Sequence, residues 1–170
     1  MIQMRDLSAH FSRSELQCRC CGRLQIDSRL LDGLEKLRAQ AGTPVVIHAG
    51  YRCPEHNAAV GGVPHSEHTL GLAADIALPG LSLQRMYELA LEVPQFAQGG
   101  IGVYDGGFLH VDVREHRARW ARVSGQYVGV AALVREPELV ATADAEHAQE
   151  SKSAQDSQGG SKNSEDLFLL

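Results

Sequence analysis

The chain has 170 residues, 44% of them hydrophobic, which is enough to bury the core of one globular domain. Its net charge of −5 arises in residues 136–170, which hold 2 basic and 8 acidic residues, because residues 1–135 hold 14 basic and 13 acidic residues and are nearly neutral. A near-neutral domain lacks the basic patch of a nucleic-acid-binding protein, and no apolar run is long enough to span a membrane, so we expect neither kind of partner.

The four cysteines are Cys18, Cys20, Cys21 and Cys53. Residues 1–16 lack the apolar stretch of a secretory signal, so we expect synthesis in the cytoplasm, where cysteines stay reduced. The CRCC run does not have the paired C-x-x-C spacing of a strong zinc motif. A structural role without redox chemistry is the preferred interpretation. A zinc site, or a cysteine-based redox or metal-sensor protein, is the alternative.

The first half of the chain predicts a helix, a strand and a long loop. Residues 1–26 are expected to be irregular, and Asp27 then caps a helix over residues 28–41. Leucines share one face of this helix, and a glycine and a proline follow it (Leu30, Leu31, Leu34, Leu37, Gly42 and Pro44). Residues 45–50 predict a strand. Residues 50–66 are rich in Gly, Pro, Asn and His, which predicts a long functional loop.

Apolar runs in the second half predict three strands and a helix. The strands are expected where β-branched or alternating residues recur (72–78, 99–104 and 108–114). Ser82 starts the helix, which runs to about Glu92. The tripeptide Asp105-Gly106-Gly107 between the last two strands is a hairpin signal.

The C-terminal part is expected to lack a fold of its own. We expect the compact part to end at Trp120, and residues 141–166, rich in Ala, Ser and Gln, to be disordered. The predicted organisation is a domain over residues 1–135, followed by an acidic tail over residues 136–170.

Two predicted strands each place metal-binding side chains on one face. Alternation in FLHVDVR puts His110 and Asp112 on the same face. In LAADIAL the carboxylate of Asp75 interrupts an apolar run, and a buried charge is costly unless a cation compensates it. His68 lies in the loop before this strand and can reach the same cation. Two histidines, an aspartate and a water resemble the ligands of a catalytic zinc, so we predict one Zn²⁺ bound by His68, Asp75 and His110.

Three segments carry a family resemblance: AGYRCPEHNAAVGG, SEHTLGLAADI and GGIGVYDGGFLHVDVR, the last followed by ARW. Together they resemble the zinc D-alanyl-D-alanine carboxypeptidase family. That family groups with the D,D-dipeptidases of vancomycin resistance, phage endolysin peptidases and bacterial murein endopeptidases, and shares its fold with the hedgehog signalling domain. The resemblance covers residues 8–122. It implies the same three zinc ligands and an α+β fold, a small single domain in which helices flank an antiparallel sheet that carries the zinc.

The resemblance also implies roles for two further residues. Arg52 matches the arginine of the family's G-Y-R motif, which implies that Arg52 binds the substrate and stabilises the oxyanion that develops in the transition state. Ser66 is a candidate substrate-binding residue, and a hydroxyl that only stabilises its loop is the alternative.

The general base is not assigned by the motif. Several members of the family place a Glu or Asp three positions before the last zinc histidine, and this chain has Gly107 there. We predict Asp112 as the base because it shares the strand face with His110. Orienting a ligand histidine is the alternative role for Asp112. Glu67 and Asp105 are the next candidates for the base.

The predicted function is zinc-dependent hydrolysis of an amide bond in peptidoglycan stem peptides or cross-links, by a monomeric carboxypeptidase or endopeptidase. A cytoplasmic product without a signal fits a phage endolysin that lysis releases to the cell wall, a protein carried in a phage particle, or a host enzyme. The alternative function is a non-catalytic, zinc-containing module that binds the cell wall or a peptide, which the absence of an acid at Gly107 favours.

Overall fold

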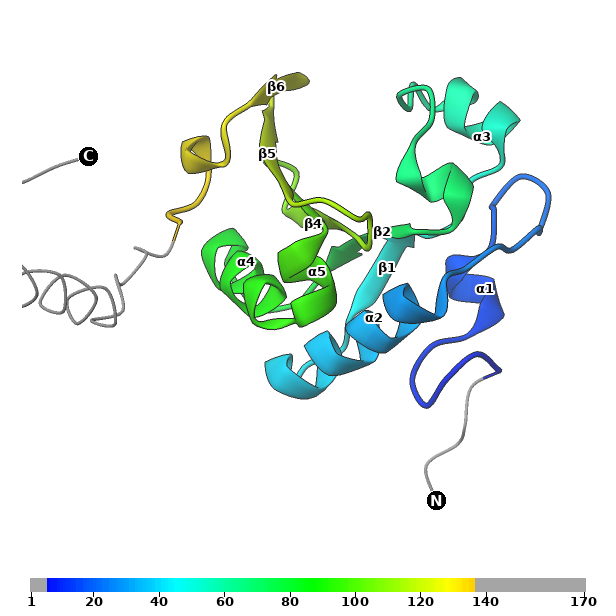
Figure 1. Cartoon of the computed structure of the whole chain (residues 1–170), viewed down its shortest axis with the longest axis horizontal. Helices are drawn as coiled ribbons and strands as arrows, with labels where there is room; N and C mark the ends of the chain where they lie inside the picture. Colours follow the sequence, from blue (N-terminus) through cyan, green and yellow to red (C-terminus); the bar gives the residue numbers. More distant parts are fainter. Residues whose placement is uncertain (1–5, 137–170) are drawn as a thin grey trace, which may run out of the picture. The chain divides into compact units, whose positions relative to one another are not determined.

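The computed structural model describes residues 6–136, in which six strands form one sheet (Figure 1). The strands follow the order β1-β2-β4-β3-β5-β6 (β1 Val46–Ala49, β2 Ala73–Ala77, β3 Gly100–Tyr104, β4 Phe108–Asp112, β5 Ala118–Val123 and β6 Gln126–Val128). Neighbours are antiparallel except β3 and β5, because β5 runs opposite to β4 but lies on the far side of β3. The α+β class is confirmed, and the sheet is mixed rather than wholly antiparallel.

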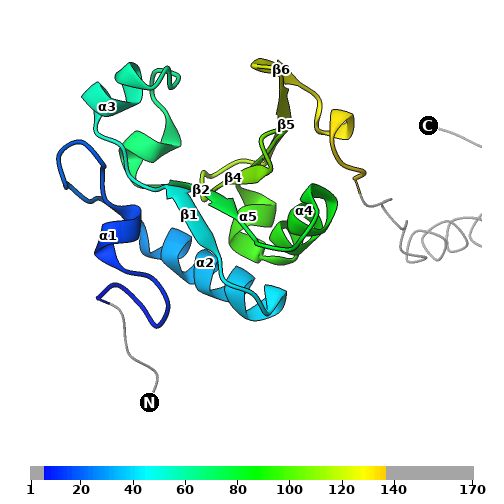
Figure 2. The same ribbon diagram turned by 180° about the vertical axis from the view of Figure 1, so that it is seen from behind.

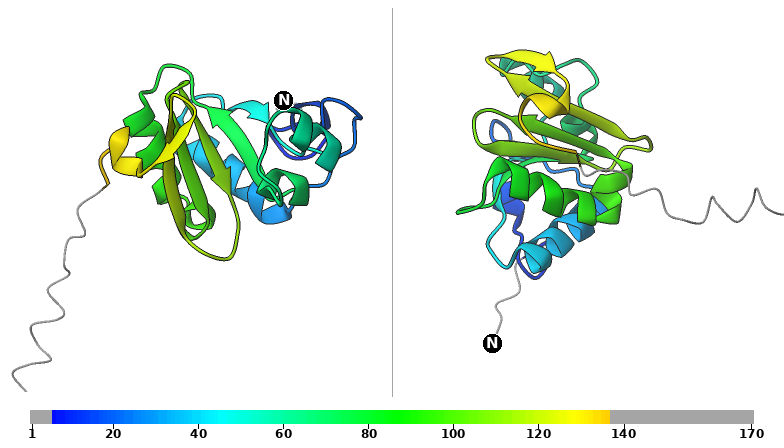
Figure 3. Two further views of the ribbon diagram at one scale, coloured as in Figure 1. Left: turned by 90° about the horizontal axis from the view of Figure 1, so that it is seen from above. Right: turned by 90° about the vertical axis from the view of Figure 1, so that its left-hand side faces the viewer.

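Three helices cover one face of the sheet (Figure 3). They are α2 (Ser28–Ala41), α4 (Leu83–Glu92) and α5 (Pro94–Gln98). Their apolar side chains pack with those of β2, β3 and β4 in one core (Leu30, Leu34, Leu37, Met86, Leu89, Phe96, Ile76, Ile101, Leu109 and Val111). Each such side chain contributes about 1.5–3 kcal/mol when it is fully buried. Because strand side chains alternate, the other face of the sheet is left for polar groups.

The predicted helices and strands are confirmed to within two residues at their ends. The side chains of Asp27 and Ser82 cap α2 and α4 as expected, by accepting from the backbone N–H groups of Arg29 and Arg85. The sequence did not predict the short elements α1 (Arg13–Leu16), α3 (Pro54–Ala59), the 3₁₀ turn η1 (Glu67–Leu70) and α5. The loop between α1 and α2 lies beside the start of α3 (Figure 1 and Figure 2).

The fold continues past Trp120, which corrects its expected end. Strands β5 and β6 and the 3₁₀ turn η2 (Val130–Ala132) follow, and Val130 and Val134 are buried in the core. The predicted disorder of residues 141–166 lies outside the described residues. Within residues 6–136, no helix has the length and apolar character that crossing a membrane requires.

Gly71, which ends η1, should not tolerate a side chain. Its φ is +72°, a conformation that costs other residues about 1–2 kcal/mol, and a Cβ there would lie 2.5 Å from the carbonyl oxygen of Gln25. We expect Gly71→Ala to lower the free energy of unfolding by more than Gly42→Ala does, because Gly42 has φ +63° but open space around its Cβ position. Urea titration of both variants measures the difference. Equal losses would show that the contact with Gln25 relaxes without cost.

Candidate metal centre

The three predicted ligands meet on the face of the sheet opposite the helices. Asp75 on β2 and His110 on β4 are direct partners in the antiparallel register, and His68 reaches them from η1. The Nε2 atom of His68 lies 3.2 Å from Oδ1 of Asp75 and 3.2 Å from Nδ1 of His110. That Nδ1 lies 3.1 Å from the same carboxylate oxygen. The three ligand atoms therefore form a nearly equilateral triangle.

In each of the two histidine rings, the nitrogen that faces away from Asp75 forms a hydrogen bond with the protein. Nδ1 of His68 donates to the carbonyl oxygen of Gly50 at 2.7 Å, and Nε2 of His110 donates to Oδ2 of Asp112 at 3.0 Å. Metal binding requires neutral rings, and with these hydrogen bonds in place a neutral ring of either histidine turns its unprotonated nitrogen towards Asp75. Tetrahedral zinc with bonds of about 2.0–2.1 Å separates its ligand atoms by about 3.4 Å, close to the sides of this triangle. His68, Asp75 and His110 therefore fit a three-ligand zinc site.

Burial and hydrogen bonding set the charges of this centre. Burial opposes ionisation of Asp75, but its contacts with the rings of His110 and His68 outweigh burial and hold the pKa of the carboxyl well below its usual range. Burial lowers the pKa of His68, which favours the neutral, metal-binding ring. Burial acts the same way on His110, but the hydrogen bonds to Asp112 and Asp75 prevail and raise its pKa to about 9. Carboxylates that stabilise a proton at this ring also stabilise a metal cation bound to it.

Asp112 lies behind His110, a position that favours the alternative role of orienting this histidine over the predicted role of general base. Its side chain is fully buried, at 0% exposure, and Asp112 does not line the cavity described below. Its Oδ1 accepts from the backbone N–H of Gly100 and from Nε of Arg114, both at 2.8 Å, while Oδ2 accepts from His110. Because its oxygens face protein donors, Asp112 is placed to orient His110 rather than to reach a water in the cavity, and both roles stay predictions.

Asp112→Asn should weaken zinc binding by about 10–100-fold, the usual effect of removing a carboxylate that orients a ligand histidine. The amide keeps one acceptor oxygen, so a donor of His110, Gly100 or Arg114 loses its partner. Activity should return when zinc is added, whereas the loss of a general base would not be rescued. Competition with a metal indicator measures the affinity, and Glu115→Gln, an exposed carboxylate, is the control. Lost activity at unchanged zinc affinity would contradict the orienting role.

Two glycines of β3 leave room for this arrangement. Gly100 pairs with Asp112, and Gly102 pairs with His110. A Cβ at Gly100 would lie 2.2 Å from Oδ2 of Asp112, and one at Gly102 would lie 2.4 Å from Cε2 of Trp120. The indole ring of Trp120 in turn packs against His110, with 5.2 Å between ring centroids. Beside Asp112 and His110, strand β3 therefore has no side chain on the face of the metal centre, and its only side chain on that face is Tyr104, at the end of the strand.

A cavity of about 440 Å³ is lined by all three ligands. Aromatic and cationic side chains form much of its wall (Tyr104, Phe108, Trp120, Tyr127, Arg52, Arg114 and Arg122). Among the described residues, Glu67 is the only carboxylate besides Asp75 that lines it. Asp105, the other candidate base, lies on the exposed hairpin outside this lining.

Arg52 and Ser66 both line the cavity, and their predicted contacts with substrate stay predictions. Arg52, with a side chain 18% exposed, donates from Nη2 to Oδ2 of Asp75, the oxygen that the histidines do not share. The Oγ of Ser66 accepts from the backbone N–H of His68 at 3.4 Å, so this hydroxyl also stabilises the turn. Arg114 also lines the cavity and was not predicted as a site residue. Alternation along FLHVDVR places it on the face of His110 and Asp112, which is the signal that could have identified it.

The chain is similar to a known protein family. A family model described as Peptidase M15 matches residues 9–112, which is more than half of the chain. The matched residues include His68, Asp75 and His110 and end before Trp120. A comparison with curated proteins found no match.

Proposed function

Because this chain belongs to the peptidase M15 family, whose members are zinc-dependent metallopeptidases, we propose that it hydrolyses an amide bond of peptidoglycan, in a stem peptide or a cross-link, as a carboxypeptidase or endopeptidase. One observation carries the proposal: the ligand atoms of His68, Asp75 and His110 converge on the wall of a cavity of about 440 Å³. A cavity of a few hundred Å³ holds a small ligand or part of a peptide.

The cavity wall supports a peptide substrate that carries negative charge. Stem peptides end in free carboxylates, and the guanidinium groups of Arg52, Arg114 and Arg122 give the cavity wall positive charge that attracts a carboxylate. The aromatic rings of Trp120 and Tyr127 offer apolar contact area for small side chains.

The proposed mechanism assigns a separate task to each of three groups. His68, Asp75 and His110 would hold the zinc ion, which would supply Lewis-acid polarisation of the scissile carbonyl and acidify a water. Arg52, held at the wall by Asp75, stabilises the negative charge that develops on the carbonyl oxygen in the transition state. Glu67 accepts the proton of the attacking water and returns it to the leaving amine. The guanidinium of Arg114, with Nε 3.8 Å from Oε1 of Glu67, holds this carboxylate at the cavity.

Digestion of purified peptidoglycan tests the proposal. We expect new muropeptides whose masses identify the bond that is cut, and no products after removal of zinc with a chelator. A non-catalytic module, the alternative that Gly107 favoured, would bind the sacculi and release nothing. A zinc-loaded protein that cuts no peptide bond of any muropeptide would refute the proposed activity.

A further inference from the structure

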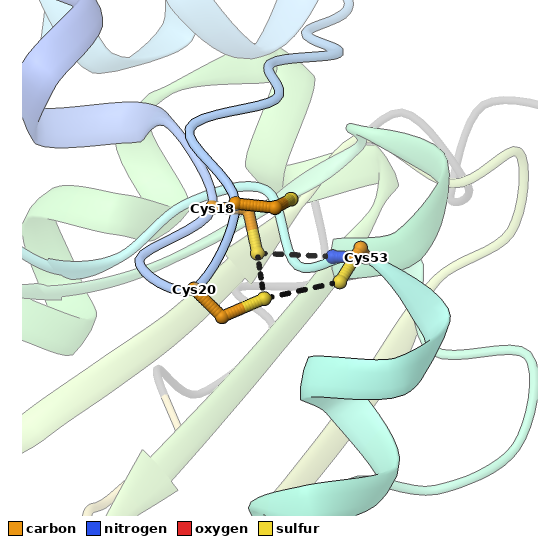
Figure 4. A group of neighbouring side chains, drawn as sticks. Cys18, Cys20 and Cys53 are labelled. Atoms are coloured by element: carbon orange, nitrogen blue, oxygen red, sulfur yellow. Dashed lines mark hydrogen bonds between the residues drawn. The ribbon is translucent and has the colours of Figure 1, made fainter.

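Four cysteines form a second cluster, outside the lining of the peptidase cavity. Three lie in the loop between α1 and α2, and the fourth, Cys53, is the residue before α3. All four are free thiols, and their sulfur atoms lie within 4.8 Å of one another. Figure 4 shows Cys18, Cys20 and Cys53 with their sulfur atoms turned towards a common point. The peptidase activity uses none of these groups.

The spacing of the sulfur atoms matches a metal site better than a disulfide. Sγ of Cys20 lies 3.5 Å from that of Cys18 and 3.4 Å from that of Cys53. A disulfide needs about 2.05 Å. Tetrahedral zinc with Zn–S bonds of about 2.3 Å separates its sulfur atoms by about 3.8 Å. The four thiols are thus arranged around a space that fits one zinc ion.

N–H donors surround the sulfur atoms and favour the thiolate form of the cysteines. The N–H groups of Cys53 and His56 point at Sγ of Cys18 and of Cys53, each at 3.4 Å, and Nε of Arg23 points at Sγ of Cys21 at 3.3 Å. Such donors stabilise negative charge on sulfur. A tight turn closes the loop, with the N–H of Gly22 donating to the carbonyl oxygen of Cys18 at 2.9 Å. Three of the four sulfur atoms therefore already face an N–H donor.

We propose that Cys18, Cys20, Cys21 and Cys53 bind a second zinc ion, which has a structural role. Four sulfur ligands in a tetrahedron leave no open position, as in structural zinc sites. On binding, the four thiols release their protons to solvent, and four thiolates around Zn²⁺ leave a net charge of −2 that the guanidinium of Arg23 partly balances.

The second site would support the first one through the segment that precedes α3. The N–H of Tyr51 donates to the carbonyl oxygen of Leu16 at 2.8 Å, so this segment already pairs with the end of α1. Its Gly50 carbonyl orients His68, and Arg52 is the neighbour of Cys53. A zinc ion shared by Cys53 and the loop would fix Gly50 and Arg52 without touching the substrate.

Metal counting in full-length variants tests the proposal. We expect two zinc ions per wild-type chain, one in Cys20→Ser, one in His68→Ala and none in the double variant. Cys20 is exposed, so serine there opens no cavity in the core, unlike serine at the buried Cys18 or Cys53. Arg19→Lys is the matched control, because it changes an exposed neighbour of Cys20 and no sulfur atom, and it should keep both ions.

Cobalt substitution identifies the ligands. Sulfur-to-cobalt charge-transfer absorption should appear in the wild type and in His68→Ala, and should be absent from Cys20→Ser. Loss of the second metal should also lower the melting temperature, because binding of a structural metal is linked to folding. A wild type with a single metal and no sulfur-to-cobalt absorption would overturn the proposal. So would a stable disulfide among the four cysteines after anaerobic purification with zinc, or iron in place of zinc.

Discussion

Alanine in place of His68, Asp75 or His110 should abolish peptide hydrolysis and remove the zinc ion from the peptidase centre. A catalytic zinc is held by three protein ligands, and each of these variants leaves two. Asp75→Ala also removes the only carboxylate of the ligand set and deprives Arg52 of its ion-pair partner. Loss of zinc and loss of turnover should therefore coincide in all three variants.

Elemental analysis and muropeptide digestion measure the two losses together. His116→Ala is the control, because this histidine is exposed and lies outside the ligand group. The cysteine cluster is intact in all four variants, so its sulfur-to-cobalt absorption should persist and show that the chain is folded. A ligand variant that retained zinc at the peptidase centre and wild-type turnover would show that the site has been assigned to the wrong residues.

Glu67→Gln should keep the zinc and the fold but lower kcat by about 10²–10⁴-fold, the usual contribution of a general base. The amide is nearly the same size as the carboxylate but cannot accept a proton from water at neutral pH. The side chain of Glu67 is 18% exposed and contacts Arg114 only at 3.8 Å, so its replacement leaves no buried charge unpaired. Zinc content should accordingly match that of the wild type.

Asp105→Asn is the matched control for Glu67→Gln. It makes the same chemical change at an exposed carboxylate of the hairpin, two residues before Gly107, and should leave kcat unchanged. The two variants are compared at saturating zinc and at several substrate concentrations, so that kcat is separated from KM. If Asp105→Asn lost turnover and Glu67→Gln did not, the proton acceptor would be Asp105.

The parts of the site that lie on regular strands could be predicted from the sequence. Alternation alone places His110 and Asp112 on one face of β4, and Asp75 opposite the apolar residues of β2. Alternation does not show how far each side chain extends above the sheet. Asp112 was predicted as the base because it shares that face with His110, but the register of β3 places Gly100 beside it, and the resulting space holds its carboxylate beneath the histidine.

The short elements could not be predicted because hydrophobic periodicity does not define them. The helix α3 and the 3₁₀ turn η1 begin at side-chain caps from Cys53 and Ser66 and have too few residues for an apolar face to recur. Strands β5 and β6 could not be predicted for a different reason. Residues of β5 are mostly half-buried and those of β6 are exposed, so neither strand has the apolar run by which a strand is predicted from sequence.

The two glycines of β3 under the metal centre mark positions of this enzyme that cannot vary, unlike the rim of its cavity. A library that randomises Gly100 or Gly102 should return almost only glycine, since any side chain there displaces Asp112 or Trp120. The rim of the cavity has no such restriction, because Val60, Val63 and Tyr127 line it while remaining largely exposed to solvent. Directed evolution of substrate choice should therefore accumulate changes at the rim and leave Gly100 and Gly102 unchanged.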